Sequence, residues 1–98
     1  MNLNKINLSP EQARFAEMVS EYPRLAGLWD WQRRELKMIL WENEKKLMSH
    51  SEIILAQFFI SIWTQQYTFE FDLIKAASLL DKKARQLIAS WILEPFWP

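Results

Sequence analysis

His50 is the one histidine of the sequence, and therefore its one candidate imidazole for acid–base or nucleophilic chemistry. It lies between Ser49 and Ser51, so an imidazole and two hydroxyls are adjacent in the chain. Nucleophilic catalysis by such a set would also need a group that orients the imidazole and donors that hold an oxyanion. Neither accompanies His50 in the sequence, and we interpret it as an exposed residue in the first turn of a helix.

The carboxylates offer a second kind of chemistry, general acid–base catalysis. Four of them occur as two close pairs: Glu42 with Glu44, and Glu70 with Asp72. Nothing in their spacing brings the two pairs into one pocket, so we interpret them as solvated and helix-capping residues. The absence of cysteine and the single histidine argue against a transition-metal site, and one glycine leaves no phosphate-binding loop. We therefore expect no enzymatic activity, no metal and no cofactor.

Composition and charge define the broad class of protein. The chain has 98 residues, half of them hydrophobic, which suits one domain with a modest core. Twelve basic residues balance twelve acidic ones, so no overall charge favours nucleic acid or an anionic membrane. The lack of cysteine suits a reducing cytosol, and the first residues lack the apolar core of a signal peptide. We expect one cytoplasmic domain over residues 1–98, with residues 1–8 as an extended lead-in and 96–98 as an apolar tail.

Residues 50–67 form the most apolar segment of the chain. Ser49 precedes Glu52 by three residues, the spacing of a capping box, so a helix should begin there. Its apolar residues surround most of the helix, which is typical of a helix in an interior. The unbroken apolar pieces are too short for a membrane span, which needs roughly 20 residues. A buried strand over residues 58–63 is the alternative, but the caps and the length favour a helix.

Four further helices are expected around this central one. They comprise about residues 10–21, 31–48, 73–80 and 82–94. Ser9 should cap the first and Pro23 should end it, whereas Asp30 should cap the second. Residues 24–29 are expected to form a bend or an irregular turn, and residues 68–72 a connection or the first turn of the helix that follows. The inward stripe of the second helix should contain Leu36, Ile39, Leu40, Asn43 and Leu47. The sequence therefore predicts an all-α, single-domain bundle of about five helices around residues 50–67.

The aromatic residues are the main functional signal. Six Trp, six Phe and two Tyr are more than a domain of this length easily buries, and protein interfaces are enriched in such residues. The apolar tail either folds back onto the core or projects toward a partner. We predict a Trp-rich regulatory, adaptor or inhibitor protein that binds another protein, and we expect an exposed apolar patch, a homodimer face, or both. The candidate contact residues are Trp29, Trp31, Trp41, Phe96 and Trp97.

DNA binding is the second functional hypothesis. Residues 71–92 can form a helix–turn–helix whose second helix begins with Lys82, Lys83 and Arg85, where a recognition helix contacts bases. The usual turn glycine is absent, and the chain from Ser49 onward has four basic residues against five acidic ones. A nucleic-acid-binding protein generally has a basic patch. We therefore rank DNA binding below protein binding.

Overall fold

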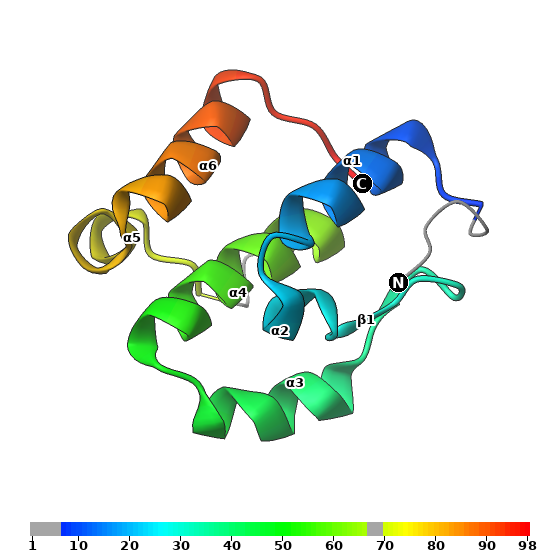
Figure 1. The fold of residues 1–98 in the computed structure, drawn as a ribbon, viewed down its shortest axis with the longest axis horizontal. Coiled ribbons are helices and arrows are strands. Elements are labelled where there is room, and N and C mark those ends of the chain that lie inside the picture. Colours follow the sequence, from blue (N-terminus) through cyan, green and yellow to red (C-terminus); the bar gives the residue numbers. More distant parts are fainter. Residues whose placement is uncertain (1–6, 67–69) are drawn as a thin grey trace. The chain divides into compact units, whose positions relative to one another are not determined.

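The computed structural model describes residues 7–66 and 70–98, and these residues are mainly helical (Figure 1). They contain six α-helices: α1 (Pro10–Val19), α2 (Pro23–Ala26), α3 (Met38–Glu44), α4 (His50–Thr64), α5 (Leu73–Leu79) and α6 (Lys82–Leu93). A short 3-10 helix, Lys45–Leu47, follows α3, and two strands of two residues each pair ahead of it. The predicted all-α helical bundle is therefore confirmed.

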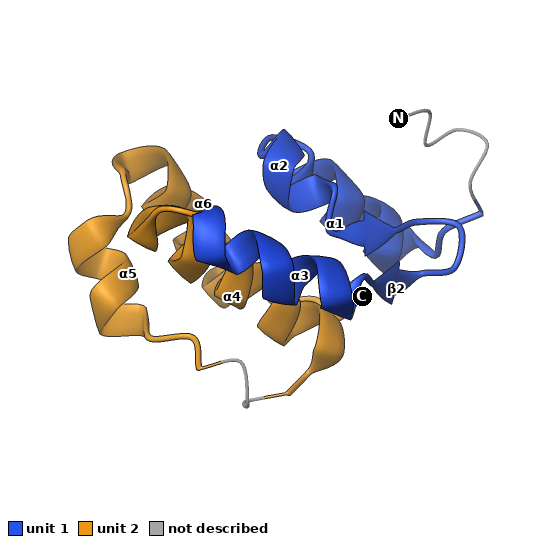
Figure 2. Cartoon of the chain, turned by 90° about the horizontal axis from the view of Figure 1, so that it is seen from below, with its two compact units in different colours: residues 1–47, 98 blue, residues 48–97 orange. Residues whose placement is uncertain are grey.

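The chain divides into two compact units (Figure 2). Unit 1 comprises residues 1–47 with residue 98, and unit 2 comprises residues 48–97. The expectation of one domain over residues 1–98 stays a prediction. Residues 1–6 of the predicted lead-in lie outside the described residues.

Helix α1 begins as its capping box predicts. The Ser9 hydroxyl accepts a hydrogen bond from the Gln12 amide, and the Ser9 amide donates to the Gln12 side chain, both at 3.1 Å. The helix ends at Val19 rather than Glu21, because the Tyr22 amide bonds the Val19 carbonyl at 2.9 Å and turns the chain. Pro23 therefore does not end this helix but opens α2, where its missing N–H is harmless.

The predicted single helix over residues 31–48 is wrong. Strand β1 (Trp29–Asp30) pairs antiparallel with β2 (Glu35–Leu36), and only then does α3 begin. The Asp30 carboxylate, expected to cap a helix, instead accepts the Arg33 amide at 3.0 Å within the turn. Aspartate favours this kind of local turn bond, and Arg34 completes the turn with a left-handed φ of 58°.

The inward stripe predicted for that helix is also wrong. Ile39 and Leu47 are 81% and 74% exposed, whereas Trp41 is buried. The helix starts at Met38, and the chain tightens into a 3-10 helix at Lys45. Because a 3-10 helix has three residues per turn, a stripe drawn with one α-helical period over residues 31–48 does not stay on one face.

Unit 1 contains an aromatic cluster built on the strand pair. The rings of Trp29 and Trp31 stack with centroids 5.9 Å apart, and Phe15 of α1 meets the Trp29 ring edge-on at 5.2 Å. All three side chains are buried. Residues two apart on an extended chain share a face, which brings both indoles against α1.

Helix α4 in unit 2 confirms the predicted helix and excludes the strand alternative. The Glu52 amide donates to the Ser49 hydroxyl at 3.2 Å, and the Ser49 amide donates to the Glu52 carboxylate at 3.1 Å. The helix ends at Thr64 because Gln65 takes a left-handed φ of 55°. The predicted end at Tyr67 lies outside the described residues, as does part of the predicted 68–72 connection. Seven residues of α4 are buried: Ile54, Leu55, Ala56, Phe58, Phe59, Ile60 and Ile62.

Helices α5 and α6 follow from two aspartate caps. The Asp72 carboxylate accepts the amides of Ile74 and Lys75 at 2.9 and 3.0 Å. The Asp81 carboxylate accepts the Ala84 amide at 2.9 Å. Both helix starts therefore lie close to where the sequence predicts them. Among the described helices, none has both the length and the apolar character that crossing a bilayer requires.

Candidate interaction surface

Trp91 on α6 organises the end of unit 2. Its ring meets Phe58 of α4 edge-on at 5.6 Å and Trp97 of the tail edge-on at 5.2 Å. Each such aromatic pair stabilises by about 0.5–1.5 kcal/mol beyond the apolar area it buries. The indole nitrogen of Trp91 also donates to the Phe96 carbonyl oxygen at 3.0 Å. The tail is therefore packed against unit 2, and its position follows from Trp91.

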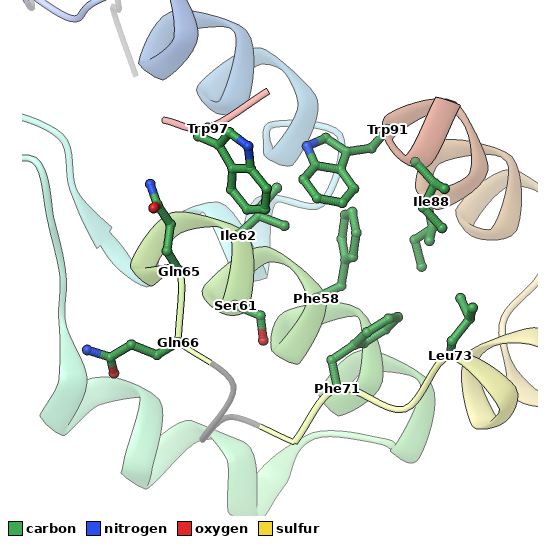
Figure 3. A pocket seen from close by; sticks show the side chains of 11 residues that line it. Phe58, Ser61, Ile62, Gln65, Gln66, Phe71, Leu73, Ile88, Trp91 and Trp97 are labelled. Atoms are coloured by element: carbon green, nitrogen blue, oxygen red, sulfur yellow. The ribbon is translucent and has the colours of Figure 1, made fainter. Parts of the chain in front are cut away.

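A hollow of about 510 Å³ lies beside these rings, wholly within unit 2 (Figure 3). Its volume falls within the range of about 300–1,000 Å³ that is usual for ligand pockets. Its polar lining consists of Ser61, Gln65 and Gln66, and none of the charged residues that the structure describes lines it. The apolar lining consists of Phe58, Ile62, Phe71, Leu73, Ile88, Trp91, Ile92 and Trp97.

A second, smaller hollow of about 130 Å³ lies between α5 and α6. It shares Leu73, Ile88 and Ile92 with the first, so the two hollows adjoin along α6. We call them together the α5–α6 furrow. Arg85 is the charged residue of its lining, and the other lining residues of the smaller hollow are Ala76, Ala77 and Ala89.

Large apolar side chains are exposed in unit 2, and three of them, Leu73, Ile92 and Trp97, line the furrow. Trp97 is 53% exposed although its ring packs on Trp91. Soluble proteins expose single apolar side chains commonly, but groups of them mark interaction sites. The exposed group within unit 2 comprises Leu73, Ile74, Leu79, Ile92, Leu93 and Trp97.

The five predicted contact residues are placed in two different environments. Trp29, Trp31 and Trp41 are buried, with exposed fractions of 2–4%. Phe96 is partly buried and Trp97 about half exposed, and both lie on the tail beside the furrow. Partner binding by any of the five stays a prediction, but the tail pair is accessible as it stands.

Sequence reasoning missed part of this surface. Ile92 was not among the predicted contact residues, yet it is about half exposed and lines both hollows. Helix α6 has two apolar stripes that share Ile88. One faces the core and includes Ala84 and Ile88, and the other lines the furrow and includes Ile88, Ala89 and Ile92. The spacing of Arg85, Ile88, Ala89 and Ile92 at i, i+3, i+4 and i+7 was the available signal.

The predicted nucleic-acid contacts lie together at the start of α6. All three side chains are exposed: Lys82 and Lys83 are the first two residues of α6, and Arg85 is the fourth. The Arg85 Nε donates to the Asp81 carbonyl oxygen at 3.4 Å, and no carboxylate of the described residues forms an ion pair with this guanidinium. Contact with nucleic acid stays a prediction.

His50 is exposed in the first turn of α4, where the sequence predicts it. Within residues 7–66 and 70–98, no group of three or more potential metal ligands is close enough to hold an ion. The chain matches no family model, and no curated protein or solved structure is significantly similar to it. Function is therefore argued from the surface of the chain itself.

Proposed function

We propose that this chain is a non-catalytic protein-binding module that acts inside the cell as an adaptor, inhibitor or regulatory protein. Its binding surface is the α5–α6 furrow together with Trp97. The observation that carries the proposal is the half-exposed Trp97 ring beside a hollow lined by aromatic and aliphatic side chains. Covering apolar surface is favourable by about 25 cal/mol per Å², so a partner that covers this group gains binding energy.

Trp97 is the expected anchor of this interface. Tryptophan is enriched among the few residues that carry most of the binding energy of an interface, and truncating such a residue costs about 2 kcal/mol or more. The edge-on contact with Trp91 holds its ring in one orientation before binding, which lowers the entropy lost on association.

The test is to capture partners on the immobilised chain, identify them, and measure the affinity of a purified partner for Trp97→Ala. We expect affinity to fall by at least about tenfold, the equivalent of about 1.4 kcal/mol, with little change in melting temperature. Leu47→Ala is the matched control, since Leu47 is exposed in unit 1 and should leave affinity unchanged. If Trp97→Ala lowers melting temperature and affinity in parallel, Trp97 belongs to the core and the proposal fails.

The protein that binds this surface can also be a second copy of the chain, in which case the surface forms a homodimer. A stable homodimer of standard size buries roughly 800 Å² per subunit. Light scattering after gel filtration separates the two cases. A dimer that Trp97→Ala converts to a monomer would assign the surface to self-association.

DNA binding is the second candidate, favoured by one observation. Lys82 and Lys83 occupy the first two positions of α6, at the positive end of the helix dipole, where cations are unfavourable. Two cations at a position that costs helix stability favour a role other than stability, and contact with phosphates is such a role. Retention on heparin and duplex DNA at low salt tests it, with Lys82, Lys83 and Arg85 replaced together by Glu. Retention that this replacement leaves unchanged removes the candidate, because phosphate contacts must depend on these charges.

A further inference from the structure

We infer that the α5–α6 furrow receives an amphipathic helix of the partner protein, and that an acidic residue at one end of the apolar stripe of that helix pairs with Arg85. The inference rests on the proposed protein-binding function and names the class of partner. Binding of an amphipathic helix in an apolar groove is a recurrent mode of recognition, with anchors at i, i+3 or i+4, and i+7.

The length of the furrow along α6 is sufficient for two turns of a bound helix. Arg85, Ile88, Ala89 and Ile92 lie on one face of α6, and Leu73 of α5 lies opposite. From Arg85 to Ile92 the furrow follows α6 for seven residues, a rise of about 10 Å, or two turns of a helix. The larger hollow extends it as far as Trp97.

Small side chains line the smaller hollow, so a helix lying over it can approach α5 and α6 closely and insert a side chain. Ala77 and Ala89 are exposed on the facing helices and line the smaller hollow. Helix axes pack about 8–10 Å apart, and the shorter distances require small residues at the contact. Ile92 and Leu73, each about half exposed, border this strip and supply apolar surface to either side of an inserted side chain.

The charges of the furrow give the bound helix a direction. Arg85 is the charged residue of the smaller hollow, and Lys82 is exposed one turn earlier on α6. Neither forms an ion pair with a carboxylate of the described residues. At the other end, the described lining of the larger hollow includes the uncharged polar residues Gln65 and Gln66 and no charged residue. A carboxylate therefore fits at the Arg85 end, where it can accept two parallel N–H bonds, and an uncharged apolar anchor fits beside Trp97.

Nucleic acid fits this furrow less well than a helix. Duplex DNA presents a phosphate charge about every 1.7 Å, whereas the furrow has its positive charge at one end and apolar side chains along the rest. Burying phosphate against isoleucine and tryptophan would cost its hydration without compensation.

The test uses the full chain and three capped, alanine-rich 14-residue peptides. Each peptide carries leucines at i, i+3, i+4 and i+7. The three peptides differ only at one position, one turn before this stripe, which is Glu, Gln or Lys. Binding is followed by the fluorescence of the chain's tryptophans and by calorimetry. We expect saturable one-to-one binding of the Glu peptide, about tenfold weaker binding of the Gln peptide, and weaker binding still of the Lys peptide.

Two pairs of variants locate the site. Arg85→Gln should abolish the preference for the Glu peptide over the Gln peptide, whereas Lys46→Gln, which removes one exposed positive charge in unit 1, should preserve it. Ala89→Trp should block the furrow and abolish binding of all three peptides. Ala13→Trp, the same change at an exposed position of α1, should leave binding intact.

Three results would overturn the inference. They are no saturable binding of the Glu peptide, a preference for the Glu peptide over the Gln peptide that persists in Arg85→Gln, and peptide binding that survives Ala89→Trp. Salt-sensitive retention on duplex DNA that Arg85→Gln abolishes, with no peptide bound, would assign the site to nucleic acid instead. If the peptides fail while capture of a partner still depends on Trp97, the proposed protein-binding function stands and only the helical, acidic partner is excluded.

Discussion

The indole nitrogen of Trp91 donates to the carbonyl oxygen of Phe96 at 3.0 Å, which ties the last helix to the tail that follows it. The same indole ring supports the ring of Trp97 edge-on. One residue therefore sets both the path of the tail and the orientation of its exposed tryptophan. The position of Trp97 in the candidate interaction surface therefore depends on Trp91.

Trp91→Phe tests that dependence. Phenylalanine keeps an aromatic ring against Phe58 but removes the N–H donor, so the free energy of unfolding should fall by about 1–2 kcal/mol. The tail should also loosen, and acrylamide should quench the fluorescence of Trp97 more strongly. Because the chain has other tryptophans, the contribution of Trp97 is obtained by subtracting the signal of a matched variant in which Trp97 is replaced by Phe, with and without Trp91→Phe. An unchanged Trp97 contribution to quenching would show that the Trp91–Phe96 bond does not hold the tail.

Ser61→Ala tests a buried hydroxyl in the wall of the larger hollow. The Ser61 Oγ is buried and has no hydrogen-bond partner among the described residues. Removing an unsatisfied buried polar group recovers part of its desolvation cost, which is about 1–3 kcal/mol. We expect the free energy of unfolding to rise or stay constant in denaturant titrations. Thr64→Val is the comparison, because the Thr64 hydroxyl donates to the Ile60 carbonyl at 2.7 Å and its loss should not stabilise. A loss above about 1 kcal/mol in Ser61→Ala would reveal a partner for this hydroxyl.

Ser49→Ala tests the helix start on which the layout of unit 2 depends. The hydroxyl of Ser49 accepts the Glu52 amide, so its removal leaves an amide of the first turn without its cap. The expected loss is about 1 kcal/mol in the free energy of unfolding, measured by denaturant titration. Ser78→Ala is a suitable control, since that exposed hydroxyl only donates to the carbonyl of its own helix at Lys75. Equal effects of the two substitutions would mean that the cap contributes nothing specific.

Lys82→Glu and Lys46→Glu make the same charge change at opposite helix ends. Lys82 is the first residue of α6, where the positive end of the dipole disfavours a cation. Lys46 lies in the last turn of the 3-10 helix that follows α3, where a cation is favoured. We expect Lys82→Glu to raise and Lys46→Glu to lower the free energy of unfolding, each by about 0.3–1 kcal/mol at low salt. Thermal unfolding at two salt concentrations checks both signs. Effects of the same sign, or effects that salt does not reduce, would contradict the dipole argument.

Local signals in the sequence predicted most helix starts. Ser9, Ser49, Asp72 and Asp81 each accept the amide bonds expected of a cap, because a cap depends only on residues within one turn. Asp30 followed the same rule and was misassigned, since its side chain serves a tight turn between strands of two residues each. Strands this short leave no alternating pattern to detect.

The surface was less predictable than the helices. Trp97 was recognised as a candidate because it follows the terminator Pro95, which is a local feature. The furrow was not, because it arises where α5 and α6 face each other across Leu73 and Ile88. That pairing depends on tertiary packing, which the period of one helix does not reveal. The same limit explains Trp41, which is buried although its place on the expected helix suggested otherwise.

The most direct test of whether a partner covers Trp97 and the α5–α6 furrow is hydroxyl-radical footprinting of the chain, free and bound to a purified partner. We predict that the partner reduces the labelling of Trp97 and Ile92 several-fold and leaves Ile39 and Leu47, which are exposed in unit 1, labelled as before. Unchanged labelling of Trp97 and Ile92 in a saturated complex, with protection of Ile39 and Leu47 instead, would contradict the account.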